Sequence, residues 1–177
     1  MKNINKYKEA AEKFLPEKIK VLFIAESPPA NGAFFFFKFS KQEILLTTIT
    51  TAILGDGKGY SRDDPKIEFL NILQERGYFL IDAVEYPINT TRDRNRELII
   101  KQETDNLIDR LKDLERQNKI DGNTKIILIK KSVFNVLNNS LKQIGYNILN
   151  KVKIDFPKYY NDRDTIREVR NLLEINP

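Results

Sequence analysis

The sequence has 177 residues, a length typical of a single domain. Apolar residues make up 41% and charged residues 31%, and 30 Lys and Arg against 25 Asp and Glu give a net charge of +5. The sequence contains no Cys and no His, which excludes disulfides, thiolate nucleophiles, iron–sulfur clusters and imidazole acid–base catalysis. Any catalysis must therefore use carboxylates, Lys, Tyr, hydroxyls, backbone dipoles or a hard cation held by oxygen ligands, and we predict no resident cofactor.

Residues 1–6 are polar and charged and lack the apolar stretch of a secretory signal. No apolar run approaches the ~18 residues that are needed to cross a bilayer. We therefore expect a cytoplasmic protein that does not associate with membranes.

Apolar spacing and capping residues predict the elements of the first half of the chain. Helices are predicted over 4–15, from the capping box at 40–43 to Ile53, and from Pro65 to Arg76, and strands over 19–25 and 78–84. The first strand is apolar throughout, as in a strand covered on both faces. Residues 26–39 form a long irregular segment that contains four consecutive Phe residues, and 55–64 is a glycine-rich loop.

The second half of the chain continues the alternation of helices and strands. A polar, basic loop over 89–96 precedes a helix from Glu97 to Leu114, which has the clearest one-sided apolar pattern in the sequence. Strands are then predicted over 125–129 and 152–155, and helices over about 132–141 and 165–173.

This order predicts an α/β fold, a three-layer α/β/α sandwich around a central, mostly parallel sheet of about four strands. Such sheets place their sites beyond the carboxyl ends of the strands. Segments 26–39, 82–87, 130–132 and 155–160 should therefore line a single edge.

The residues at the strand ends resemble a known family. Residues 21–29 read VLFIAESPP and are followed by Gly32 and aromatic residues, which is similar to the first motif of the uracil-DNA glycosylase superfamily. Residues 80–87 look like the second conserved strand of that family, and 154–158 fall where the family carries its His-Pro-Ser loop. The resemblance spans the chain from the first strand to the last and implies a glycosylase-like fold that binds DNA.

This sequence departs from the family at four positions. Ala25 and Pro29 replace glycines, Asp82 stands where the family has a base-reading Asn, and Phe156 replaces the His. The family His stabilises the departing base as its anion, so this site has lost that electrostatic contribution. An ionised Asp82 accepts hydrogen bonds and cannot donate one to a uracil carbonyl.

Cleavage of an N-glycosidic bond needs a carboxylate near the sugar and a donor or cation near the base. By the resemblance, Glu26 takes the sugar side. From their positions at the ends of the later strands, Lys158 or Lys130 is the candidate cation. The remaining candidates for substrate binding are Ser27, Pro28, Gly32, Phe34, Phe35, Asp82 and Phe156, and those for nucleic-acid binding are Arg92, Arg94, Lys130, Tyr159, Tyr160 and Arg163.

Several of these residues also have a purely structural interpretation: Glu26 could cap the turn after its strand, and Asp82 could cap a helix or pair with an Arg.

Two other functions stay open. One is a non-catalytic glycosylase-like protein that binds nucleic acid, a nucleotide or a protein partner. The other is a small phosphate-handling α/β enzyme that holds Mg²⁺ through Glu26, Asp82 and Asp155. The preferred base, the choice of single or double strands and the oligomeric state are not predicted.

Overall fold

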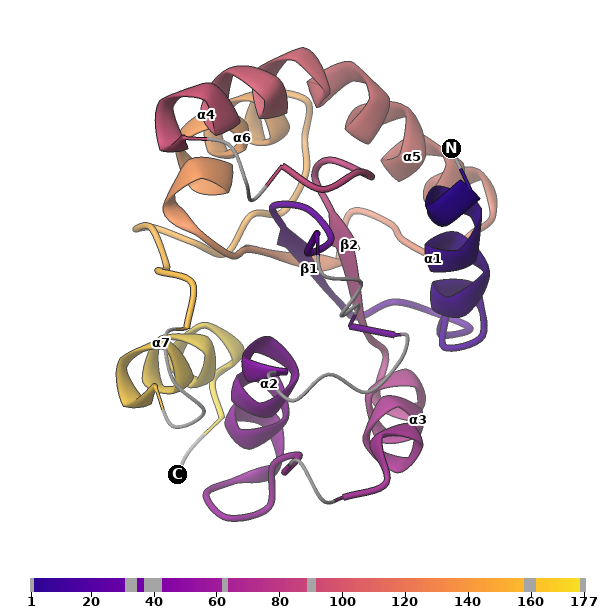
Figure 1. Cartoon of the computed structure of the whole chain (residues 1–177), viewed down its shortest axis with the longest axis vertical. Coiled ribbons are helices and arrows are strands. Elements are labelled where there is room, and N and C mark those ends of the chain that lie inside the picture. Colours follow the sequence, from indigo (N-terminus) through magenta and orange to yellow (C-terminus); the bar gives the residue numbers. More distant parts are fainter. Residues whose placement is uncertain are drawn as a thin grey trace.

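The computed structural model of the chain describes residues 2–30, 35–36, 43–61, 64–88, 92–157 and 162–175. In this part of the chain a three-stranded parallel sheet has the order β2-β1-β3 (Figure 1). Its strands are β1 (Val21–Ala25), β2 (Tyr78–Asp82) and β3 (Lys125–Leu128). Ala25 is in register with Asp82, and Ile24 is in register with Leu128, so the three strands end at one edge of the sheet.

Helices flank the sheet on both sides (Figure 1). They are α1 (Lys2–Glu12), α2 (Ile44–Leu54), α3 (Lys66–Arg76), α4 (Asp93–Gln102), α5 (Thr104–Arg116), α6 (Lys131–Gln143) and α7 (Arg163–Leu173). In Figure 1, α4, α5 and α6 lie on one side of the strands and α2, α3 and α7 on the other. An α/β architecture with a parallel sheet is therefore confirmed. No helix within the described ranges is long and apolar enough to cross a membrane.

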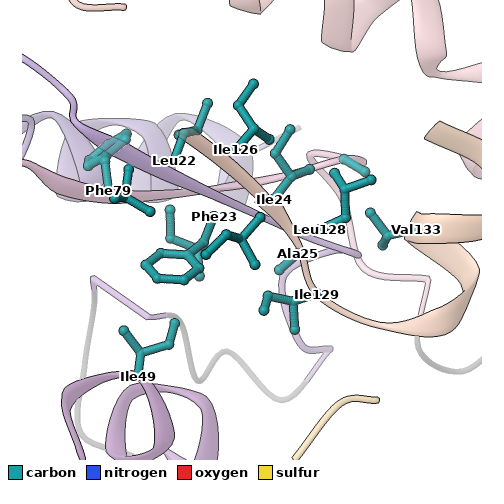
Figure 2. Packing of buried hydrophobic residues seen from close by; sticks show 14 of the residues in the cluster. Leu22, Phe23, Ile24, Ala25, Ile49, Phe79, Ile126, Leu128, Ile129 and Val133 are labelled. Carbon is teal, nitrogen blue, oxygen red and sulfur yellow. The ribbon is translucent and has the colours of Figure 1, made fainter. Parts of the chain in front are cut away.

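All five side chains of β1 are buried. Figure 2 shows Leu22 and Ile24 on one face of the sheet with Ile126, and Phe23 on the other face, directed toward Ile49 of α2. Both faces of the strand are covered by helices, which explains why β1 is apolar at every position rather than at alternate ones.

The predicted fourth strand at 152–155 is present only as an isolated parallel bridge between Ile154 and Ile129. A side chain explains why the ladder does not continue along β3. Asn150 accepts a hydrogen bond from the Leu128 N–H at 2.7 Å and donates one to the Leu128 carbonyl at 3.0 Å. The amide side chain thus satisfies the backbone groups that a neighbouring strand would otherwise bind.

The helix that was predicted from Glu97 begins earlier and has a break. Helix α4 starts at Asp93, inside the segment 89–96 that was expected to be a loop, and Glu103 separates it from α5. Residues 89–91 and the first three residues of the capping box at 40–43 lie outside the described residues, and its fourth residue, Glu43, is the N-cap of α2.

A polar contact and a close approach fix the end of α2. Arg170 of α7 donates to the carbonyl of Thr51 at 2.9 Å and to that of Ala52 at 3.3 Å, and it pairs with Asp56 at 2.8 Å. Gly59 then passes so close to α2 that a Cβ atom there would lie 2.0 Å from Thr51 Oγ1 and 2.6 Å from Thr51 N. Only glycine fits at that position without displacing backbone.

Candidate functional site

Glu26 follows β1 directly and is only 6% exposed. Its Oε2 lies 2.5 Å from Lys130 Nζ and 3.8 Å from Arg96 Nη1, and its Oε1 accepts a hydrogen bond from Ser132 Oγ at 2.6 Å. Lys130 lies between β3 and α6, Arg96 lies in α4, and Ser132 lies in the first turn of α6. A buried carboxylate is costly unless it is paired and hydrogen-bonded. The sequence supplies both kinds of partner to Glu26.

Lys130 has an unusual backbone conformation, with φ 88° and ψ 140°. A residue with a Cβ atom rarely adopts this region, and holding it there costs about 1–3 kcal/mol. Two backbone hydrogen bonds fix the residue: its N–H donates to the Ile154 carbonyl at 3.0 Å, and its carbonyl accepts from Phe134 N at 3.1 Å. The strain is therefore maintained by the surrounding fold, and the Lys130 side chain is directed to Glu26.

The segments that follow β1 and β2 are joined beyond the sheet. The N–H groups of Ala83 and Val84 donate to the carbonyls of Ala25 and Glu26, at 2.8 and 3.0 Å. Farther along, the Ile88 N–H donates to Ser27 Oγ at 3.3 Å. The residues that begin the segments 26–39, 82–87 and 130–132 thus meet at one edge, as predicted. The fourth segment, 155–160, follows Ile154, whose carbonyl accepts from the Lys130 N–H. Phe36 of the first segment instead stacks on Phe79, near the start of β2.

Asp82 ends β2 beside this edge. Burial raises the pKa of its carboxyl to about 7, an effect that Arg110 opposes and that Glu26 and Glu85 reinforce. Arg110 on α5 donates from Nη2 to the carbonyls of Asp82 and Ala83, at 2.9 and 3.0 Å, and its Nη1 lies 3.8 Å from Glu85 Oε1. Arg110 therefore fixes the backbone at the end of β2. A carboxyl with a pKa near neutrality is suited to exchange protons at physiological pH.

A pocket of about 490 Å³ opens between α1, β2 and α5, and we call it the Asp82 pocket. It is lined by Tyr7, Lys8, Ala11, Glu12, Leu15, Pro28, Phe79, Leu80, Ile81, Asp82, Glu85, Arg110, Asp113, Leu114 and Gln117. Its size lies within the range of about 300–1,000 Å³ that small-molecule sites occupy. Most of its wall area is apolar, and six charged side chains line it.

The predicted substrate-binding residues are found in several places. Pro28 and Asp82 both line the Asp82 pocket. Phe35 packs edge-on against Phe36, with 5.0 Å between ring centroids, and Phe36 stacks on Phe79 at 5.1 Å. Phe35 is therefore attached to the core beside the pocket. The side chain of Phe156 is 41% exposed on the surface and does not line the Asp82 pocket. Gly32, Phe34 and the candidate cation Lys158 lie outside the described residues.

The predicted nucleic-acid contacts are only partly described. Arg92 and Arg163 are exposed, and Lys130 is paired with Glu26. Arg94 belongs to α4, but its side chain, like Tyr159 and Tyr160, lies outside the described part of the chain.

Sequence reasoning did not assign three residues that shape this region: Arg96, Ser132 and Arg110. Arg96 was predicted to lie in the polar, basic loop over 89–96, whereas it lies in the first turn of α4, which places it near Glu26. Ser132 belongs to a segment that was predicted to reach the edge, but nothing marked its hydroxyl as a partner of Glu26. Arg110 is one of several charged residues on an amphipathic helix, and no sequence signal distinguishes it.

A site for a metal ion is not assembled by the described residues, where no three His, Cys, Asp or Glu side chains lie close together. Glu26 is already bound by Lys130 and Ser132, and Asp155 is exposed. The three carboxylates of the Mg²⁺ alternative therefore do not form a ligand set in the described part of the chain.

Comparison of this chain with protein-family models, with curated proteins and with solved structures found no match in any of the three.

Proposed function

We propose that this chain binds DNA at the carboxyl edge of its sheet, takes up a single base in the Asp82 pocket and excises it, on a scaffold like that of the uracil-DNA glycosylases. The observation that carries the proposal is that Pro28 and Asp82 line one pocket. Pro28 follows β1 and Asp82 ends β2, and the resemblance implies substrate binding for both.

The arrangement of the strands supports the finer description of the fold. Ile154 pairs in parallel with Ile129, directly after β3, so a fourth extended segment lies next to β3 in the order that follows β2-β1-β3. With helices on both sides of these strands, the arrangement is consistent with a three-layer sandwich around about four parallel strands.

Cations near the carboxyl edge support the DNA-binding part of the proposal. Arg92 occupies the N-cap position of α4, Lys130 occupies that of α6, and Lys131 is the first residue of α6. The positive ends of two helix dipoles add to these side chains, and such a combination suits phosphate groups. Affinity that arises in this way falls with salt, because binding releases counterions from the DNA.

Because Glu26 is ion-paired, we assign it and Asp82 roles that differ from those implied by the resemblance. Lys130 and Arg96 offset the charge of Glu26, and the carboxylate is buried. We therefore assign Glu26 a positioning role: it holds the two cations at the edge. Asp82 lies on the pocket and is the better group to accept a proton from an attacking water.

Two measurements on labelled oligonucleotides test the proposal. Fluorescence anisotropy measures binding to single and double strands, and gel analysis after alkaline cleavage measures excision of uracil, hypoxanthine, xanthine and methylated purines. We expect salt-dependent binding and product from at least one substrate, with product lost in Asp82→Asn and binding retained. An absence of binding to every oligonucleotide at low salt would overturn the proposal.

The non-catalytic alternative has its own supporting observation, because the carboxylate that the resemblance implies for catalysis is neutralised by Lys130 in this structure. It predicts binding without product on every substrate. In that case Lys131→Ala, at an exposed position, should weaken DNA binding, since the exposed cations at the edge would be the main determinant of affinity.

A further inference from the structure

The charges that line the Asp82 pocket are opposite in sign to those of the chain as a whole. Four carboxylates line it, those of Glu12, Asp82, Glu85 and Asp113, and Asp113 is paired with Arg116 on the same helix. Three carboxylates therefore remain against the two cations of Lys8 and Arg110. The whole sequence carries a net charge of +5. A pocket with an excess of carboxylates in a basic protein favours a neutral or positively charged occupant and disfavours a free anion.

The positive charge of Arg110 is already used within the protein. One of its terminal nitrogens donates to the carbonyls of Asp82 and Ala83, and the other lies 3.8 Å from Glu85. Arg110 thus stabilises the backbone at the end of β2. The Asp82 carboxyl is then the acidic group at the inner, strand side of the pocket, while Glu12 and Lys8 are exposed on α1.

Aromatic rings complete the pocket. Tyr7 of α1 and Phe79 of β2 both line it, together with the apolar side chains of Ala11, Leu15 and Leu114. Aromatic rings attract organic cations through their quadrupole, and an apolar wall suits the flat body of a base. Rings and carboxylates in one pocket are a combination that recognises planar organic cations.

Taking the proposed function as its basis, we propose that the Asp82 pocket selects N-alkylated purines, which carry a positive charge, over uracil and other neutral bases. The carboxylate excess, the aromatic wall and the absence of His from the whole sequence together carry this inference. The substrate class would then be alkylated rather than deaminated DNA.

The chemistry of the leaving base explains how such a site works without a group that stabilises an anion. When the bond between C1′ and the ring nitrogen of an alkylated purine breaks, both electrons go to the base and cancel its positive charge. The base therefore leaves as a neutral molecule. The oxygen of a water molecule bonds to C1′, and one proton of that water goes to the Asp82 carboxylate and then to solvent. No oxidant, metal ion or further reactant is required.

The binding test uses a matched pair of nucleosides that differ by one methyl group and one charge. Isothermal titration with 1-methyladenosine and adenosine at pH 7.5 should show tighter binding of the methylated compound by about 10- to 100-fold, as a charge-assisted hydrogen bond implies. Asp82→Asn should remove this preference. Asp109→Asn, at an exposed position on α5 that does not line the pocket, is the control and should retain it.

The second test compares excision of 7-methylguanine and uracil from duplexes of the same sequence. We expect release of 7-methylguanine to be faster, and Asp82→Asn to abolish it. Equal affinity for both nucleosides, or faster release of uracil, would overturn the inference. DNA binding measured on the same samples separates the two proposals: binding that persists without a preference for the alkylated base refutes only this inference, whereas loss of binding refutes the proposed function.

Discussion

The replacement of Asp82 by Asn tests the environment of the pocket through protein stability. Burial raises the pKa of this carboxyl from its ordinary value of 3.8 to about 7. A raised pKa means that the folded protein holds the proton more tightly than the unfolded chain does. The contribution of Asp82 to stability is therefore complete below about pH 4 and is lost as the pH rises through 7.

The size of this effect follows from linkage. The free energy of unfolding should fall by about 1.4 kcal/mol per pH unit between the two pKa values, for a total of at most about 4 kcal/mol. Water that reaches the pocket reduces this total, because it lowers the cost of the ionised form. Asn has the same shape as Asp and does not ionise, so the free energy of unfolding of Asp82→Asn should not show this fall with rising pH.

Urea denaturation at pH 5 and pH 8, followed by circular dichroism, measures the effect. At each pH we compare the free energy of unfolding of Asp82→Asn with that of the unchanged protein. We expect the difference in favour of Asp82→Asn to be larger at pH 8 than at pH 5 by about 2 kcal/mol. Asp109→Asn, at an exposed position, should show no such growth. A difference that does not change with pH, or that shrinks as the pH rises, would refute the assignment of Asp82 as a half-buried carboxyl with a raised pKa.

Five further substitutions test the scaffold, each by denaturant unfolding at neutral pH. Lys130→Ala should lower the free energy of unfolding by about 3 kcal/mol, because it leaves Glu26 buried without its nearest cation. Lys130→Gly should be more stable than Lys130→Ala by about 1 kcal/mol, because glycine accepts φ 88°. Equal stabilities of the two variants would show that the backbone of Lys130 is not strained. Gly59→Ala should cost about 3 kcal/mol, since a Cβ would meet the backbone of Thr51, and an unchanged midpoint would show that the loop can move away. Arg170→Ala should cost about 1–3 kcal/mol, because the last carbonyls of α2 lose their donor, whereas Arg167→Ala, which removes an exposed pair on the same helix, should cost less than about 1 kcal/mol.

The elements of the fold follow closely from local sequence, and their exact ends do not. Three compact apolar runs predicted β1, β2 and β3, because a strand covered on both faces is apolar throughout. Gly77 marked the end of α3 correctly, since its φ of 80° is a conformation that glycine adopts at little cost. Ile154 was predicted to continue a strand, but the competing contact of Asn150 with β3 could not be read from the sequence.

The site was predictable in position and less so in detail. The rule that parallel strands place their sites beyond their carboxyl ends correctly brought the segments of Glu26, Asp82 and Lys130 to one edge. The rule does not say which charges pair. The contact of Lys130 with Glu26 depends on an unusual φ of Lys130. The hydrogen bond from Arg110 to the Asp82 carbonyl depends on the rotation of α5 about its own axis. Both are set by tertiary packing.

The most direct test of the account is a carbon-detected NMR titration of the Asp82 carboxyl, with and without a duplex that contains 7-methylguanine. The account predicts an apparent pKa near 7 in the free protein and a value well below it in the complex, because a cation in the pocket favours the ionised carboxylate. A carboxyl that titrates near 4 in the free protein, or whose titration the alkylated duplex leaves unchanged, would contradict the claim that a charged base enters this pocket.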